Sequence, residues 1–128
     1  METRSFGLHE TALRVRAMRN EVLASNLANA DTPGYKARDI DFKAALAGAQ
    51  DAQVQLRRTS PMHQNSWSTT DVGPVKYRVP VQPTLDGNTV ETDVEQAEYS
   101  QNAVQYRASL AFLDGQIRSL RYAIRGSD

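Results

Sequence analysis

An unbroken apolar repeat near the C-terminal end constrains the fold more than any other feature of the sequence. Eight residues recur at alternating steps of four and three, which is the a/d spacing of a coiled-coil helix. They are Tyr99, Ala103, Tyr106, Leu110, Leu113, Ile117, Leu120 and Ile124. Thr92 and Glu95 fit a capping box at the start of this helix. We therefore assign residues 92–128 to one C-terminal coiled-coil helix.

A second, shorter helical pattern lies near the N-terminus. Its main row repeats every seven residues and consists of Leu8, Val15, Val22 and Asn29. The pattern predicts a helix over residues 8–30, followed by a turn at Thr32, Pro33, Gly34 and Tyr35. Proline at the second turn position and glycine at the third are typical of a type II turn. Residues 1–35 are therefore expected to form a helix that ends in a tight turn.

Two asparagines, Asn26 and Asn29, lie near the end of the predicted N-terminal helix. They could bond the local backbone where the helix ends. Alternatively, they could face another helix and fix the register of the pair, as polar residues at coiled-coil positions do. We favour the second interpretation, because Asn29 continues the row of Leu8, Val15 and Val22.

The middle of the chain, residues 36–91, carries weaker signals. A short helix with Asp39 as its cap is expected near residues 40–49. The stretch "VKYRVPVQP" alternates like a strand, but Pro80 and Pro83 confine it to an edge or to isolated extended structure. The expected fold is mainly α, with long N- and C-terminal helices pairing as a coiled coil. An irregular middle segment with a short helix and minor extended or β structure would join them.

The composition excludes several kinds of chemistry. The chain has 15 basic and 15 acidic residues and no cysteine, so it offers no net field for nucleic acid and no thiolate metal site. His9 and His63 are isolated, Asp39 and Asp41 fit a helix entry, and Trp67 fits a loop anchor. We expect a protein that is not an enzyme and that binds no metal or cofactor. No apolar run approaches the roughly 20 residues of a membrane span, and no cleaved secretory signal is visible.

Each predicted helix carries more apolar surface than a single partner helix can cover. Leu23, Leu27, Val104 and Phe112 lie outside the main rows. A two-helix pair has one interface, so these side chains would remain in water. The chain is therefore expected to be a building block whose remaining faces are covered by copies or relatives, and to be loosely ordered alone.

The run "RNEVLASNLANADTPGYKARDIDF" resembles the N-terminal signature of the bacterial flagellar rod and hook family. Its second half is most similar to proximal rod subunits. Thr59 and His63 in "RTSPMH", together with "DGNTVE" at residues 86–91, extend the resemblance toward the C-terminal helix.

The resemblance implies a structural subunit of the proximal rod that assembles helically, transmits torque and encloses the export channel. Such subunits lie in the basal body, in the periplasmic rod, and are exported without a cleaved signal peptide. Implied partners are other copies of the chain, the rod subunits FlgC, FlgF and FlgG, the rod adaptor FliE, the membrane-ring protein FliF and export gate proteins. The expected assembly interface consists of Leu8, Val15, Val22, Asn26, Asn29, Tyr99, Tyr106, Leu110, Leu113, Ile117, Leu120 and Ile124.

Other functions remain open at this point. The chain could be FlgC, the other short proximal rod subunit. It could also be a generic coiled-coil adaptor or secretion chaperone, which would form a small closed oligomer. A helical nucleic-acid-binding protein would need a basic face, which the charge balance does not supply.

Overall fold

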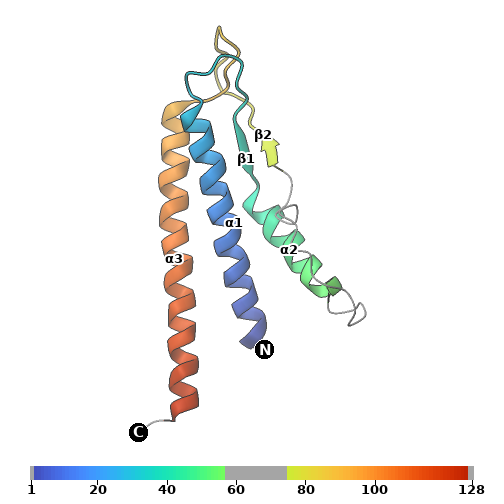
Figure 1. Cartoon of the computed structure of the whole chain (residues 1–128), viewed down its shortest axis with the longest axis vertical. Helices are drawn as coiled ribbons and strands as arrows, with labels where there is room; N and C mark the ends of the chain where they lie inside the picture. Colours follow the sequence, from blue (N-terminus) through green and yellow to red (C-terminus); the bar gives the residue numbers. More distant parts are fainter. Residues whose placement is uncertain (1, 57–74, 127–128) are drawn as a thin grey trace.

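The computed structural model describes residues 2–56 and 75–126 (Figure 1). In chain order the elements are α1 (Glu2–Ala28), β1 (Arg38–Ile40), α2 (Phe42–Leu56), β2 (Val75–Tyr77) and α3 (Thr92–Arg125). The mainly α fold with two long terminal helices is confirmed. The expectations for Thr59, His63 and Trp67 lie outside the described residues.

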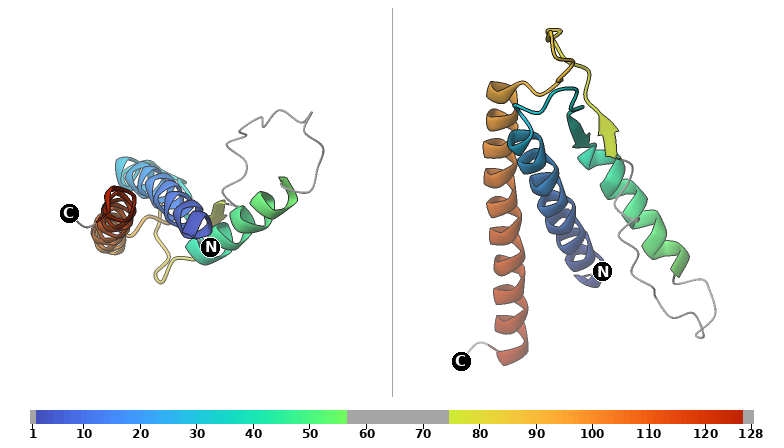
Figure 2. Two further views of the ribbon diagram at one scale, coloured as in Figure 1. Left: turned by 90° about the horizontal axis from the view of Figure 1, so that it is seen from below. Right: turned by 45° about the horizontal axis from the view of Figure 1, so that its top comes forward.

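The three helices lie side by side, with α1 in the middle (Figures 1 and 2). α1 contacts both α2 and α3, and α3 runs antiparallel to α1. The N-terminal end of α1 and the C-terminal end of α3 therefore lie at the same end of the molecule, where α3 reaches further. The loop between α1 and β1 and the loop between β2 and α3 lie together at the opposite end.

Two helix starts differ from the sequence expectation. The N–H of Ala44 donates to Oδ1 of Asp41 at 3.2 Å, so Asp41 caps α2 rather than Asp39. At α3, the capping residue is Glu91, which makes no side-chain capping bond, and the capping box is therefore wrong. Sequence spacing places Asp39 and Glu95 at helix starts, because only neighbouring residues can be recognised as partners from the sequence. Both carboxylates instead bind arginines from distant parts of the chain.

β1 and β2 form a two-stranded antiparallel sheet in which Arg38 pairs with Tyr77 and Ile40 with Val75. β1 contacts α1, and β2 lies on the outer side of the sheet (Figure 1). The strand ends before Pro80, as the missing N–H of proline requires. The expected edge strand is thus confirmed.

The apolar core lies between α1 and the β1–α2 unit. Val15, Ile40 and Ala45 are buried there, and Met18, Val22 and Phe42 pack against them. The guanidinium of Arg16 covers the Phe42 ring, 3.9 Å from its centroid. The apolar row of α1 is therefore used by β1 and α2, and α3 meets a different side of α1, which carries Arg16 and Asn20.

The contact between α1 and α3 is a series of polar pairs. Arg16 donates to Oε1 of Gln105 at 2.6 Å, and the Asn102 amide donates to Oδ1 of Asn20 at 3.2 Å and to the Arg16 carbonyl at 2.9 Å. These pairs fix the antiparallel register of the two helices, because each side chain meets a specific partner on the other helix.

The side of α3 that faces α1 includes one half of the predicted apolar row: Tyr106, Leu113 and Leu120 are half-buried, whereas Leu110, Ile117 and Ile124 are exposed. Its two buried residues are Glu95 and Asn102, and Ser109 and Gln116 continue this line as half-buried residues. The line lies one residue before the row of Ala103, Leu110, Ile117 and Ile124, which corresponds to a rotation of about 100°. The helices pair as predicted, but Glu95 and Asn102 take the most buried positions of α3 and bond polar groups of α1.

Candidate functional site: an exposed apolar row on α3

The predicted apolar residues of α3 form a row along one flank of the helix pair. We call Tyr99, Tyr106, Leu110, Leu113, Ile117, Leu120 and Ile124 the α3 row. Leu110 is 49% exposed and Ile117 is 40% exposed, while Tyr106, Leu113 and Leu120 are half-buried. Because their apolar side chains stand on a regular helix, they form a continuous surface rather than scattered exposed residues.

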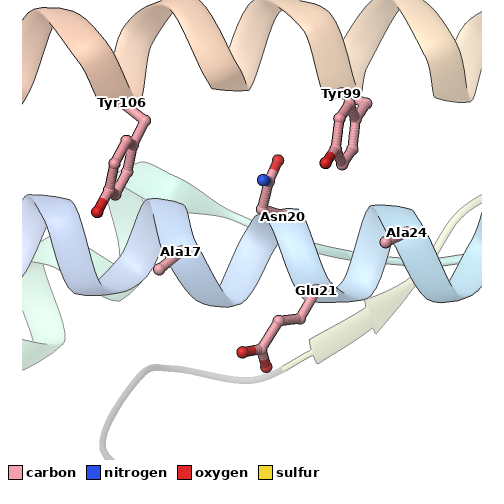
Figure 3. Close-up of a pocket in the computed structure, with 6 residues that line it drawn as sticks. All are labelled: Ala17, Asn20, Glu21, Ala24, Tyr99 and Tyr106. Atoms are coloured by element: carbon pink, nitrogen blue, oxygen red, sulfur yellow. The ribbon is translucent and has the colours of Figure 1, made fainter.

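The N-terminal half of the α3 row borders a groove against α1. Tyr99 and Tyr106 project from α3 toward α1, above Ala17, Asn20 and Ala24 (Figure 3). The groove has a volume of about 370 Å³ and is open to solvent. Ala17 and Ala24 leave space beneath the rings, and the Asn20 side chain projects from α1 between them. The flank therefore presents a ridge of α3 beside a shallow depression.

The predicted interface residues of α1 lie elsewhere. Val15 is buried and Val22 partly buried in the core against β1 and α2, and Leu8 is half-buried. The structure thus brings Val15 and Val22 together with the chain's own middle segment rather than with the α3 row. Among the predicted interface residues, Leu110, Ile117 and Ile124 of the α3 row are the aliphatic ones left exposed to meet another protein.

The two asparagines of α1 behave differently from one another. Asn26 is fully buried and donates to Oε2 of Glu95 on α3 at 3.1 Å, and to the Arg38 carbonyl at 2.6 Å. Asn29 donates to the carbonyl of Ser25, one helical turn earlier, at 2.8 Å. Asn26 therefore meets another helix, whereas the Asn29 side chain bonds the local backbone.

The Thr32–Tyr35 turn has the expected type II features. Gly34 has φ of +74°, and the N–H of Tyr35 donates to the Thr32 carbonyl at 3.3 Å. The N–H of Gly34 also donates to the carbonyl of Asp86 at 2.9 Å. The turn is therefore joined to the loop that precedes α3, which sequence reasoning treated as a separate turn.

Asn88 is the residue that locks these two loops together. It is buried, and its side-chain amide lies 2.8–3.0 Å from the carbonyl oxygens of Asn29, Ala30 and Thr32. Its Oδ1 accepts from the N–H of Val90 at 2.8 Å. One side chain thus satisfies the free carbonyls at the end of α1, a role that the pattern "DGN" does not reveal.

An ion cluster joins the helices to the sheet. It consists of Arg19 of α1, Asp39 of β1, Arg78 just after β2, and Glu95 and Glu98 of α3. Arg19 binds Asp39 and also Glu98, 2.7 Å from its Oε2. Arg78 binds Asp39 at 2.8 Å and Glu95. Sequence reasoning missed this cluster, because its members are far apart along the chain.

The cluster shifts the pKa values of its members in opposite directions. Burial alone would raise the pKa of Asp39, but hydrogen bonds from Arg19 and Arg78 outweigh it, so this pKa lies below its usual range. Burial raises the pKa of Glu95, and the bonds from Asn26 and Arg78 do not compensate fully. Hydrogen bonds and charge attraction from Asp39 and Glu98 raise the pKa of Arg19, which therefore remains charged.

Comparison with known proteins identifies the family. Residues 8–36 match the family described as flagella basal body rod protein. A FlgB rod protein of Cereibacter sphaeroides is 49% identical over 120 residues, which cover 94% of this chain and 93% of the relative. The FlgB proteins of Aeromonas hydrophila and Escherichia coli K12 are 47% and 44% identical, over 96% and 93% of this chain and 94% and 91% of theirs. The chain belongs to the FlgB family of flagellar basal body rod proteins.

The segment that matches the family description supplies one partner of several of the internal contacts described above. It contains Arg19, Asn26 and Gly34, whose partners Asp39, Glu95 and Asp86 all lie further along the chain. The matched segment therefore contacts the rest of the fold through hydrogen bonds from both its side chains and its backbone. None of the helices in the described part of the chain is long and apolar enough to cross a membrane.

Proposed function

We propose that this protein is a structural subunit of the flagellar proximal rod and that it assembles helically through the α3 row. The observation that carries this proposal is the likeness to FlgB rod proteins over nearly the full length of both chains. The relatives carry the name FlgB, so the alternative subunit FlgC is not favoured. A role of this kind is structural and not enzymatic.

The geometry of the helix pair supports assembly through α3. Covering apolar surface yields roughly 25 cal/mol per Å², and the exposed Leu110, Ile117 and Ile124 have not yet contributed that energy. The polar pairs between α1 and α3 hold the helix at a fixed register, so the row is presented without a further ordering cost. A neighbouring subunit would complete the burial that the single chain leaves unfinished.

The proposed place of the chain is the basal body, in the part of the rod that crosses the periplasm. It would reach the rod by export without a cleaved signal peptide, transmit torque and enclose the export channel. Its proposed neighbours are further copies of itself, the subunits FlgC, FlgF and FlgG, the adaptor FliE, the ring protein FliF and the export gate. The likeness to FlgB rod proteins supports the location in the basal body. The individual neighbours are part of our proposal.

Purified basal bodies provide the test. We expect mass spectrometry to find the chain in basal bodies of its own bacterium, and deletion of its gene to leave the membrane ring without a rod or hook. Restoring the intact gene should restore both. Complete rods in the deletion strain would contradict the proposal, as would a purified chain that forms a small closed oligomer and is absent from basal bodies, as an adaptor or chaperone would be.

A further inference from the structure

The outer edge of the small sheet is exposed and apolar. β2 is the outer strand, turned away from α1 (Figures 1 and 2). Alternate residues of β2 and its extension, Val75, Tyr77, Val79 and Val81, are all exposed, with Tyr77 at 72% and Val79 at 86%. Exposed apolar residues at every second position form one continuous face of an extended segment.

The backbone of the same residues faces outward. The N–H of Arg78 donates to the carbonyl of Ala37 at 2.8 Å, so Arg78 is turned toward β1. In an antiparallel pair the hydrogen-bonding direction alternates, and the N–H and C=O groups of Tyr77 and Val79 therefore point to the open edge. No group within residues 2–56 and 75–126 is hydrogen-bonded to them. This edge can accept a third strand, as in β-strand addition.

The sequence of the edge is self-complementary. "VKYRV", residues 75–79, reads apolar, basic, aromatic, basic, apolar in both directions about Tyr77. A two-fold interface needs a surface that matches itself, and an antiparallel pair centred on Tyr77 would place Val75 opposite Val79 of the second copy. The same register would place Lys76 opposite Arg78 of the second copy on the other face, and Asp41 and Asp39, which bind these two residues, would offset the like-charge contact.

We propose that two copies of the chain pair in solution through their β2 edges, with Tyr77 opposite Tyr77 of the second copy. The result is one four-stranded antiparallel sheet in the order β1–β2–β2–β1. Pairing closes the open edges and places the apolar side chains of the two copies side by side, and it removes the weakness of a two-stranded sheet, which is marginal by itself. Pro80 limits the paired segment to about five residues. This contact is separate from the α3 row and does not depend on rod assembly.

The absence of cysteine from the chain makes the register directly testable. Directly opposite residues in an antiparallel pair are about 5.5 Å apart between Cα atoms, within disulfide range. We expect purified full-length Tyr77→Cys to form disulfide dimers under mild oxidation. Val75→Cys and Val79→Cys should each remain monomeric alone but cross-link when mixed. Lys76→Cys, the matched control, should not cross-link, because its equivalents would be about 8 Å apart.

A second measurement does not depend on disulfide chemistry. Tyr77→Lys places two ammonium groups at the centre of the proposed contact, and sedimentation equilibrium should show dimer affinity at least about tenfold weaker. Tyr122→Lys, an equally exposed change on α3, should leave the affinity unchanged. Equal cross-linking at positions 76 and 77, or dimer affinity unaltered by Tyr77→Lys, would overturn the proposal. Cross-linking of Tyr77→Cys only to a different polypeptide would also overturn it.

Discussion

Arg19 and Asp39 form a two-point ion pair between α1 and β1. Nε of the guanidinium lies 2.9 Å from Oδ1, and Nη2 lies 3.0 Å from Oδ2. Arg78 binds the same carboxylate, so Asp39 holds one arginine from α1 and one from the end of β2. This one side chain therefore couples the position of the sheet to the helix pair.

Replacing Asp39 should destabilise the fold strongly. Asp39→Asn leaves Arg19 and Arg78 partly buried without their shared anion, which we expect to cost about 2–4 kcal/mol. Urea unfolding monitored by circular dichroism measures the loss. Asp114→Asn, which breaks an exposed i,i+4 pair with Arg118, is the control and should change stability by less than about 0.5 kcal/mol. Equal effects for the two variants would show that the ion cluster adds no stability.

The opposite pKa shifts of Asp39 and Glu95 predict opposite contributions to stability with pH. Asp39 has a lowered pKa, so its contribution is present above its ordinary value of 3.8 and is lost as pH falls through the folded pKa. Glu95 has a raised pKa, so its contribution is complete below its ordinary value of 4.5 and is lost as pH rises through the folded pKa. We expect Glu95→Gln to remove the decline on the alkaline side while leaving the acid side intact. Unfolding free energies between about pH 3 and 8 would show this, and an unchanged profile would contradict it.

Asn88 should tolerate loss of its side chain better than a change of charge. Asn88→Ala removes the donors to the carbonyls of Asn29, Ala30 and Thr32, at an expected cost of about 2–3 kcal/mol. Asn88→Asp keeps the shape but places a carboxylate against three carbonyl oxygens, so it should destabilise more. Chemical denaturation ranks the two, with Gln101→Ala on the exposed surface of α3 as the control. If Asn88→Asp were more stable than Asn88→Ala, the hydrogen bonds from Asn88 to these carbonyls would not be formed in solution.

Two glycines should respond to substitution in opposite directions. Gly34 has φ of +74° with no atom within 4 Å of an added Cβ, so Gly34→Val should cost about 2 kcal/mol through backbone strain alone. Gly115 lies inside α3 with equally free space, and Gly115→Ala should stabilise by about 1 kcal/mol. Thermal unfolding of both variants provides the comparison. A stabilising valine at position 34 would exclude the type II turn.

The α3 row should matter for assembly more than for the single chain. Leu110→Asp changes a half-exposed side chain, so the isolated protein should keep its helix content by circular dichroism. In a strain that lacks the wild-type gene it should nevertheless fail to restore rods and swimming, because a buried carboxylate at the subunit contact has no partner. Gln101→Asp adds the same charge away from the row and should restore both. Normal swimming with Leu110→Asp would place the assembly surface elsewhere.

Sequence patterns predict the parts of this fold that local chemistry determines. The two long helices, the Gly34 turn and the strand before Pro80 follow from helical spacing, positive φ and the missing proline N–H. The side of α3 that faces α1 does not follow, because an apolar row shows that a surface will be buried but not by which partner. Glu95 and Asn102 face α1 since β1 and α2 already cover Val15 and Val22. Asp39 and Asn88 bind partners that are dozens of residues away in the chain. A single sequence does not show which distant residues are in contact.

The polar contact between α1 and α3 has a consequence for how a filament of such subunits would grow. Each chain keeps charged and amide groups inside its helix pair and leaves Leu110, Ile117 and Ile124 exposed, so the burial of these apolar side chains would be completed only between molecules. A subunit held by one neighbour would leave again, whereas one seated against several would stay. Growth would then show a sharp critical concentration and would start from a template rather than spontaneously. Free subunits below that threshold would remain dispersed, and elongation would occur at the growing tip.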